Sequence, residues 1–185
     1  MRVGIYGGTF NPVHLGHLLL AETARDQLRL DRVLFIPTGQ PPHKSARGLL
    51  PAQERLRLLT LATRSNPVFA VSSIELDRPG PSYTIDTLRT LRERLPEARL
   101  FLLMGQDMLT VRWKGWDELK KLCTLAVARR PGGKTPARQR GLVWLTMPLL
   151  EISSSDIRAR IKAGRSIRYL VPPAVEQALR ARPKT

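Results

Sequence analysis

The sequence predicts an α/β fold in which helices cover both faces of a mainly parallel sheet. Short apolar runs alternate with helical patterns along the 185 residues. The first apolar run, residues 3–6, is followed by glycines and then by a helical stretch, as in a parallel strand that leads into a crossover helix. No linker or internal repeat divides the sequence. We therefore expect one domain over residues 1–185, with a mobile tail at 182–185.

Six apolar runs have the length of buried strands, and five stretches carry helical patterns. The predicted strands are residues 3–6, 33–37, 68–72, 99–104, 122–128 and 142–146. The predicted helices are residues 18–25, 51–64, 84–94, 153–163 and 173–182. This alternation is that of a single Rossmann-like domain, with a mainly parallel sheet and helices on both faces.

The composition fits a globular domain with its own core and argues against membrane and secreted proteins. No run of about 18 apolar residues is present, so the sequence predicts no membrane span. The amino terminus enters a strand directly, which leaves no room for a signal peptide. The single cysteine, Cys123, cannot form an internal disulfide. We therefore expect a protein of the reducing cytoplasm.

The formal net charge of +16 favours an anionic partner. The densest basic stretch, residues 129–140, has five basic residues, no acids and several Pro and Gly. We expect an exposed loop there that helps to hold phosphates. A basic nucleic-acid-binding module is the alternative from a different class, but no interleaved aromatic and basic residues support it. We expect no nucleic-acid and no membrane partner.

Residues 7–17, with the sequence GGTFNPVHLGH, lie where the first strand leads into a helix. In open α/β sheets, phosphate-bearing ligands bind at this junction. The glycines at its start allow the backbone to approach a ligand closely. His14 and His17 share one side of the first helical turn, where imidazole donors suit oxygens that gain negative charge. Gly16, between them, leaves room for a polyphosphate.

A zinc site is the alternative interpretation of the two histidines. Zinc in proteins takes three or four Cys, His or carboxylate ligands. No third ligand is evident for His14 and His17, and Cys123 stands in an apolar run. We therefore favour a phosphate-binding role and expect no metal bound directly by side chains.

A second polar cluster, residues 152–158 with the sequence ISSSDIR, begins a predicted helix. Ser153 suits the N-cap, and Asp156 follows three residues later, as in a capping box. Arg158 shares a face with the hydroxyls of Ser154 and Ser155, and its forked guanidinium suits phosphate oxygens. An ordinary serine-capped surface helix remains the alternative for this segment taken alone.

Together the two segments resemble the signature motifs of the HxGH nucleotidyltransferase superfamily, here HLGH at residues 14–17 and ISSSDIR at residues 152–158. The resemblance implies that His14, His17 and Arg158 are catalytic. His14 and His17 would hold the α- and β-phosphates of ATP, and the serines with Arg158 the β- and γ-phosphates. The implied ATP-binding residues are Gly7, Gly8, Thr9, Phe10, His14, His17, Gly105, Asp107, Ile152, Ser153, Ser154, Ser155 and Arg158.

Four further segments resemble the bacterial nicotinate-nucleotide adenylyltransferases over nearly the whole chain. They are residues 41–44, 82–88, 104–109, and 113–116 with 130–132. The resemblance implies that ATP and nicotinate mononucleotide are joined to give deamido-NAD and pyrophosphate, with Mg²⁺ accompanying ATP. The implied residues for the mononucleotide are Thr9, Lys44, Tyr83, Thr84, Asp107, Trp113 and Arg130.

Each of these segments also has an ordinary structural interpretation. Lys44 can belong to a plain loop, and Thr84 and Asp107 can cap helices. Trp113 is the candidate for stacking on the pyridine ring, although Trp113 and Trp116 can be two core anchors of one helix. The chain also departs from many family members, which have Asp where this sequence has Asn11. A carboxylate therefore cannot be essential at that position.

The alternative function is another adenylyl transfer in the same superfamily, such as that of pantetheine-phosphate adenylyltransferase. It would use both phosphate motifs but not the segments at residues 82–88 and 113–116. The sequence leaves the oligomeric state open, including a homo-oligomer.

Overall fold

The computed structural model describes residues 1–41, 48–129, 141–148 and 150–182. The strands within these ranges are β1 (Arg2–Gly8), β2 (Arg32–Pro37), β3 (Phe69–Val71), β4 (Arg99–Gly105), β5 (Thr124–Ala128) and β6 (Leu142–Leu145). The helices are α1 (Leu15–Gln27), α2 (Ala52–Thr63), α3 (Thr84–Arg94), α4 (Trp116–Leu122), α5 (Ser154–Lys162), α6 (Pro173–Arg180) and the 3₁₀ helix η1 (Gln106–Thr110).

The strands form one six-stranded sheet in the order β3-β2-β1-β4-β5-β6. Every neighbouring pair is parallel. The chain therefore builds outward from β1 to β3, returns to the centre at β4, and builds outward again in the other direction. The strand order reverses between β1 and β4, and doubly wound sheets bind ligands at the carboxyl ends of the strands beside such a reversal. The predicted Rossmann-like α/β class is confirmed.

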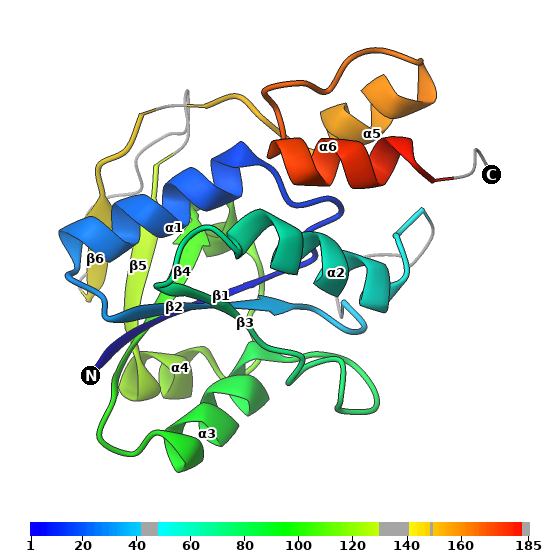
Figure 1. Cartoon of the computed structure of the whole chain (residues 1–185). Coiled ribbons are helices and arrows are strands. Elements are labelled where there is room, and N and C mark those ends of the chain that lie inside the picture. Colours follow the sequence, from blue (N-terminus) through cyan, green and yellow to red (C-terminus); the bar gives the residue numbers. More distant parts are fainter. Residues whose placement is uncertain (42–47, 130–140, 149, 183–185) are drawn as a thin grey trace.

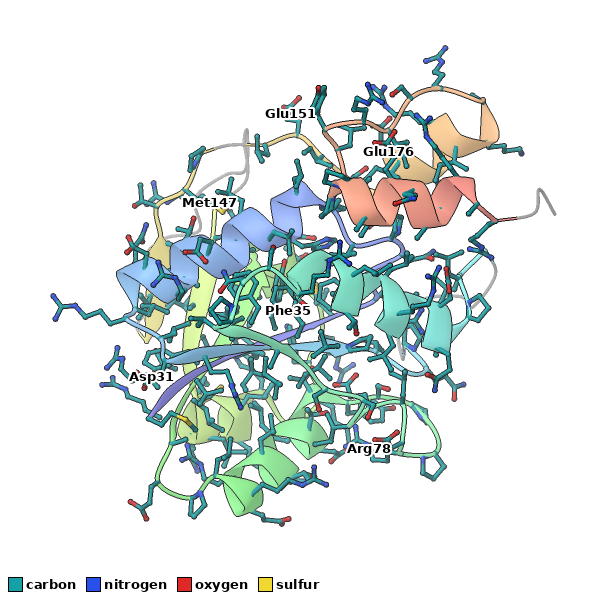
Figure 2. All side chains as sticks on the ribbon, viewed as in Figure 1. Asp31, Phe35, Arg78, Met147, Glu151 and Glu176 are labelled. Carbon is teal, nitrogen blue, oxygen red and sulfur yellow. The ribbon has the colours of Figure 1, made fainter. Side chains whose placement is uncertain are left out.

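Helices lie on both faces of the sheet, and each face has its own core (Figure 1). Helices α1, α2, α5 and α6 cover one face, and α3 and α4 cover the other. Neighbouring residues of β2 point to opposite sides, as strand geometry requires. Phe35 belongs to the core beneath α1 and α2 (Figure 2), and Ile36 belongs to the core that Leu88 of α3 completes.

Three differences from the sequence prediction concern β5, α4 and α1. We expected a strand at residues 122–128, but β5 begins at Thr124 because Leu122 is the last residue of α4. Helix α4 was not predicted, since its seven residues are too few for a clear helical period. The first helix also begins at Leu15, three residues earlier than expected. The apolar residues of α4 pack on the same core as the strands, which explains why the pattern resembled one longer strand.

Several predictions fall outside the described residues. These include the tail at 183–185 and the basic loop from residue 130 to 140. Within the described part of the chain, no helix is long and apolar enough to cross a membrane.

Candidate functional site

The loop after β1 is anchored by a buried side chain. The Asn11 side chain is 2 % exposed; its Nδ2 donates to the Gly48 carbonyl at 3.1 Å, and its Oδ1 accepts from the Leu50 amide at 2.9 Å. An amide performs both tasks, whereas an ionised carboxylate only accepts hydrogen bonds. Asn11 is therefore suited to this place as a structural anchor.

The two histidines of the loop are held together at the start of α1. His14 is the N-cap residue, and its backbone amide donates to Nδ1 of His17 at 3.2 Å. The two imidazole rings stack with centroids 3.6 Å apart. Because Nδ1 of His17 accepts a hydrogen bond, the proton of the neutral ring lies on Nε2. His17 is therefore a donor suited to an anionic oxygen.

Gly16 lies close to the His14 ring and to the second motif. A Cβ on Gly16 would stand 3.1 Å from Nδ1 of His14 and 3.9 Å from the carbonyl oxygen of Ile152. The missing side chain thus admits the His14 ring, and room for a polyphosphate at Gly16 stays a prediction. At Gly7, no described atom lies within 4 Å of a built Cβ, so the end of β1 is open on that side.

The buried ring of Phe10 packs against the ring of His17. Phe10 is 2 % exposed and adopts a φ of 48°, which is uncommon outside glycine. Its ring meets that of His17 edge-on, with centroids 5.0 Å apart, and packs on Tyr6 at 5.5 Å. These contacts hold the backbone in its unusual conformation and fix the position of the His17 ring.

The amino end of α5 is attached to this loop by two side chains. The hydroxyl of Ser154 donates to the carbonyl of Pro12 at 2.9 Å, and Nη1 of Arg158 donates to the carbonyl of Asn11 at 2.8 Å. Ser153 accepts from the Asp156 amide at 3.0 Å, which confirms it as N-cap. The fold therefore joins two motifs that lie about 140 residues apart in sequence.

Ser155, Asp156 and Arg158 of the second motif also lie in the first turns of α5. Nη2 of Arg158 donates to the hydroxyl of Ser155 at 3.2 Å. The carboxylate of Asp156 accepts from Arg160 at 3.1 Å. Exposed Arg158 and Ser155 thus stand beside the histidine loop with free backbone amides of the first helical turn, an arrangement that attracts anions.

The end of β4 contributes a second strand edge to the site. Gly105 is its last residue, and Asp107 stands in η1 directly after it. A Cβ on Gly105 would lie 2.6 Å from Oδ1 of Asp107, so the exposed Asp107 side chain folds back across Gly105. Because β1 and β4 are parallel neighbours, Asp107 and Gly7 emerge at the same edge of the sheet.

The start of α3 and the segment before α4 are packed together. Tyr83 is the N-cap of α3 and makes no side-chain capping bond, so the alternative of Thr84 as the cap is wrong. Nζ of Lys114 lies 4.2 Å from the centre of the Tyr83 ring. Gly115, with a φ of +69°, leaves room for Ile85, whose Cγ1 would be 3.2 Å from an added Cβ. Residues 113–115 therefore lie across the amino end of α3.

Trp113 stands in this segment and not in a helix. Helix α4 begins at Trp116, so the two tryptophans do not belong to one helix. The Trp113 indole donates to the Met108 carbonyl at 2.8 Å, and its ring lies 6.0 Å from that of Trp116. Trp113 is half-buried, which leaves part of its ring accessible to a ligand.

Two buried charged residues of this region were missed at the level of sequence. Arg55 of α2 is 2 % exposed and Glu75 is 4 % exposed. Arg55 stands on the buried stripe of α2 with Leu58, Leu59 and Ala62. A charge on an apolar stripe is the signal that could have revealed it. Glu75 follows a short strand and has no comparable signal. Its burial raises the pKa of the carboxyl group, against the hydrogen bond from Thr87, which lowers it.

Two predicted ligand residues, Lys44 and Arg130, lie outside the described residues. The described part of the chain contains no group of three His, Cys, Asp or Glu side chains that could hold a metal ion.

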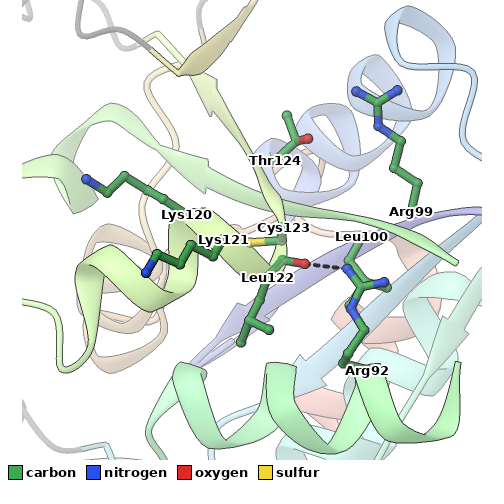
Figure 3. A pocket seen from close by; sticks show the side chains of 8 residues that line it. All are labelled: Arg92, Arg99, Leu100, Lys120, Lys121, Leu122, Cys123 and Thr124. Carbon is green, nitrogen blue, oxygen red and sulfur yellow. Dashed lines mark hydrogen bonds between the residues drawn. The ribbon is translucent and has the colours of Figure 1, made fainter. Parts of the chain in front are cut away.

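A basic hollow of about 190 Å³ lies at the opposite edge of the sheet (Figure 3). It is lined by Arg92, Arg99, Lys120 and Lys121, next to the first residues of β4 and β5. Arg92 donates a hydrogen bond to the carbonyl of Leu122, and Lys120 forms an ion pair with Asp117 at 2.7 Å. Burial raises the pKa of the neighbouring Cys123 thiol to about 12, so it stays protonated and unreactive near neutral pH.

Sequence comparison agrees with this arrangement. The chain matches the family model described as cytidylyltransferase-like over residues 5–160. It is 47 % identical over 178 residues to a protein of Thermus thermophilus, with 95 % of each chain covered. It is 44 % identical over 187 residues to one of Thermomicrobium roseum, covering 95 % of this chain and 87 % of the relative. Both relatives are described as probable nicotinate-nucleotide adenylyltransferases.

Solved structures share the fold. The chain resembles the nicotinic acid mononucleotide adenylyltransferase of Plasmodium falciparum complexed with NaAD, with a TM-score of 0.80 and 17 % identity over 95 % of this chain and 93 % of that one. The same enzyme complexed with APC gives a TM-score of 0.76, with 16 % identity over 95 % and 92 % of the two chains. With its full-length relatives and its two motifs joined by hydrogen bonds, the chain belongs to the nicotinate-nucleotide adenylyltransferase family of cytidylyltransferase-like proteins.

Proposed function

We propose that this protein joins ATP and nicotinate mononucleotide to give deamido-NAD and pyrophosphate. The observation that carries the proposal is the attachment of α5 to the histidine loop, through Ser154 to the Pro12 carbonyl and Arg158 to the Asn11 carbonyl. It gathers imidazole, hydroxyl and guanidinium groups around two helix starts, which suits a polyphosphate.

The nucleophile is the phosphate of the mononucleotide, which is already ionised near neutral pH. The reaction therefore needs no strong general base. This phosphate attacks the α-phosphorus of ATP in line, and pyrophosphate leaves. The protein supplies position and electrostatic stabilisation of the charge that develops on the phosphate oxygens.

The donor half of the site would hold ATP. His14 and His17 bind the α- and β-phosphates, with the Nε2 proton of His17 directed by the bond at its Nδ1. Ser153, Ser154, Ser155 and Arg158 bind the β- and γ-phosphates. Ser154 and Arg158 can turn from backbone carbonyls to phosphate oxygens, because hydrogen bonds of charged partners are the stronger ones.

The acceptor half would hold nicotinate mononucleotide. Tyr83 and Thr84 offer the open backbone amides at the start of α3 to the carboxylate of nicotinate. The half-buried ring of Trp113 stacks on the pyridine ring, and Asp107 orients a ribose hydroxyl. We also assign Lys44 and Arg130 to this ligand, on the resemblance alone.

Mg²⁺ would enter with ATP. Phosphate oxygens and water would hold most of its coordination positions, as Mg²⁺ prefers oxygen ligands and keeps several waters. When bound, it neutralises negative charge on the departing pyrophosphate. We further propose a cytoplasmic location, supported by the single cysteine, and one domain that acts without a nucleic-acid partner.

Release of pyrophosphate tests this proposal. The protein is incubated with ATP and Mg²⁺ and, in parallel, with nicotinate mononucleotide, nicotinamide mononucleotide or phosphopantetheine. We expect strong preference for the nicotinate form. Turnover with phosphopantetheine alone would preserve the phosphate site and overturn the acceptor. Tight, strongly salt-dependent binding of DNA without any turnover would favour the basic nucleic-acid-binding module.

A further inference from the structure

Arg55 connects three separate segments around the site. Its Nη1 donates to the Thr9 carbonyl at 2.9 Å, its Nε to the Leu50 carbonyl at 3.1 Å, and its Nη2 to the Gly39 carbonyl at 3.4 Å. Thr9 belongs to the histidine loop, and Gly39 to the loop after β2. The described residues offer this buried guanidinium carbonyl oxygens and no carboxylate within ion-pair distance.

The backbone of Gly39 links Arg55 to Ser82, which lies directly before the N-cap of α3. While its carbonyl accepts from Arg55, its amide donates to the Ser82 hydroxyl at 3.1 Å, and the Gln40 amide donates to the same oxygen at 3.3 Å. The Ser82 amide returns a bond to the Gln40 carbonyl at 2.9 Å. A Cβ on Gly39 would stand 2.6 Å from the Glu75 carbonyl oxygen, so only glycine fits here.

Glu75 completes the connection from the other side. Its Oε1 accepts from the Thr87 hydroxyl of α3 at 2.8 Å, and the neighbouring Ser82 side chain lowers the pKa of the Glu75 carboxyl group, against the effect of burial. Arg55, Gly39, Ser82, Glu75 and Thr87 thus form a continuous chain of contacts, the buried relay.

The energetics make this relay a poor source of stability. It buries a guanidinium and a carboxylate without pairing them to each other, and each loses its hydration. Apolar residues of the same volume are often equally stable or better in such places. The buried charges of Arg55 and Glu75 are therefore better explained by the positions in which they hold neighbouring segments than by stability. One end of the relay fixes Thr9 beside the histidines, and the other fixes Ser82, directly before Tyr83 and Thr84.

We propose that Arg55, Ser82 and Glu75 are positioning residues that set the acceptor-binding start of α3 relative to the phosphate loop. This inference rests on the proposed function, because it concerns the approach of the mononucleotide phosphate to ATP. In-line attack depends strongly on distance, and a displacement of about 1 Å can lower the rate roughly 100-fold. None of the three residues needs to touch either substrate.

The first test is Ser82→Ala, compared with Thr90→Ala. Thr90 lies on α3, the helix that Ser82 precedes, and among the described residues its hydroxyl bonds only to the Asp86 carbonyl, at 3.1 Å. For Ser82→Ala we expect kcat/KM for nicotinate mononucleotide to fall roughly 10- to 100-fold, with the KM for ATP within about twofold of wild type. Thr90→Ala should leave both parameters unchanged. Equal losses for the two substrates, or none, would overturn the relay.

The second test does not depend on turnover. Because Ser82 holds the amides of Gly39 and Gln40, hydrogen exchange at these two amides should accelerate in Ser82→Ala and remain unchanged in Thr90→Ala. Unchanged exchange would overturn the relay. If wild type shows no turnover with nicotinate mononucleotide, the proposed function fails, and the exchange result still decides whether Ser82 ties the two loops.

Glu75→Gln covers the case in which Ser82→Ala fails to fold. Glutamine keeps the shape of the side chain and an oxygen for Thr87, and it removes the charge. We expect the same split, a lower kcat/KM for the mononucleotide and an unchanged KM for ATP. A Glu75→Gln enzyme with wild-type values for both substrates would remove Glu75 from the relay.

Discussion

The proposed donor and acceptor halves of the site are built in different ways. The donor half consists of two short segments, residues 9–17 and 153–158, joined by hydrogen bonds from Ser154 and Arg158 to backbone carbonyls. The acceptor half gathers side chains from α3, η1 and the segment before α4, and buried charges lie behind it. The donor half can therefore be recognised in the sequence as two motifs, whereas the acceptor half depends on contacts that form only in the folded chain.

The difference shows where each half can vary. A phosphate group is recognised by donors and helix starts, which two short segments supply completely. A pyridine nucleotide must be placed by shape and by a few polar contacts, so its site depends on residues that never touch it. Changes in the donor half should therefore affect catalysis with every acceptor, and changes in the acceptor half should affect one substrate.

The largest effect should come from His17. His17→Ala removes the proposed donor to a phosphate oxygen, and we expect kcat to fall about 10²- to 10³-fold, as when other transition-state charge stabilisers are removed. Pyrophosphate release at saturating substrates measures it. His17→Asn is the control for folding, because its Oδ1 can still accept from the His14 amide. A loss below tenfold in His17→Ala would contradict the role.

Arg158 should come next. Arg158→Ala removes bonds to the Asn11 carbonyl and to the Ser155 hydroxyl, and a charged partner for ATP. We expect kcat/KM for ATP to fall roughly 10- to 100-fold, the range of a charge-assisted hydrogen bond. The half-buried Arg160 on the same helix pairs with Asp156. It provides the matched change Arg160→Ala, for which we expect little effect. Equal results for the two arginines would remove Arg158 from the donor half.

A smaller effect should come from Trp113, which belongs to the proposed acceptor half. Loss of one aromatic stacking partner should raise the KM for nicotinate mononucleotide about three- to tenfold in Trp113→Ala, with ATP binding intact. Steady-state kinetics with each substrate varied in turn separates the two. Trp144→Ala is the comparison, since Trp144 lies on β6 under Arg129 and has no proposed ligand. An unchanged KM in Trp113→Ala would shift the stacking role to Trp116.

The smallest effect concerns the pH dependence of stability. Burial raises the pKa of Glu75 above the usual value of 4.5, so the unfolded chain releases this proton first as the pH rises. Between the two pKa values the folded state holds more protons, and wild type loses stability relative to Glu75→Gln as the pH increases. Urea unfolding of both proteins at several pH values measures this difference in the free energy of unfolding.

Glu118 provides the opposite case. Arg89 lowers the pKa of this exposed carboxyl group through a side-chain hydrogen bond. Wild type should therefore gain stability relative to Glu118→Gln as the pH rises through the acidic range. The same slope in both variants would show that the burial of Glu75 does not control its titration.

Much of the fold could be predicted from the sequence because alternating apolar runs and amphipathic stretches carry it. Helix α3 was predicted with its observed bounds, and the other predicted elements within one to three residues. Helix α4 was not, since seven residues between two apolar segments give no period to detect. Local patterns also cannot reveal that Asn11 bonds to residues 48 and 50, which are close only in the folded chain.

In the candidate site, too, local features could be predicted from the sequence and long-range contacts could not. Ser153 could be recognised as an N-cap because capping is local, and the structure confirms it. The roles of the histidines, of Arg158 and of Trp113 stay predictions. Arg55 has a local signal, its place on the apolar stripe of α2, but its partners Thr9 and Gly39 lie in distant segments. Glu75 has no such signal, because its partner Thr87 lies 12 residues away.

The attachment of α5 to the first loop has a consequence for truncated chains. The groups that donate to the carbonyls of Pro12 and Asn11 stand at Ser154 and Arg158, more than 140 residues further along the chain. A chain truncated before α5 therefore leaves both carbonyls without these donors. On the proposed function, it also lacks the groups that would bind the β- and γ-phosphates of ATP.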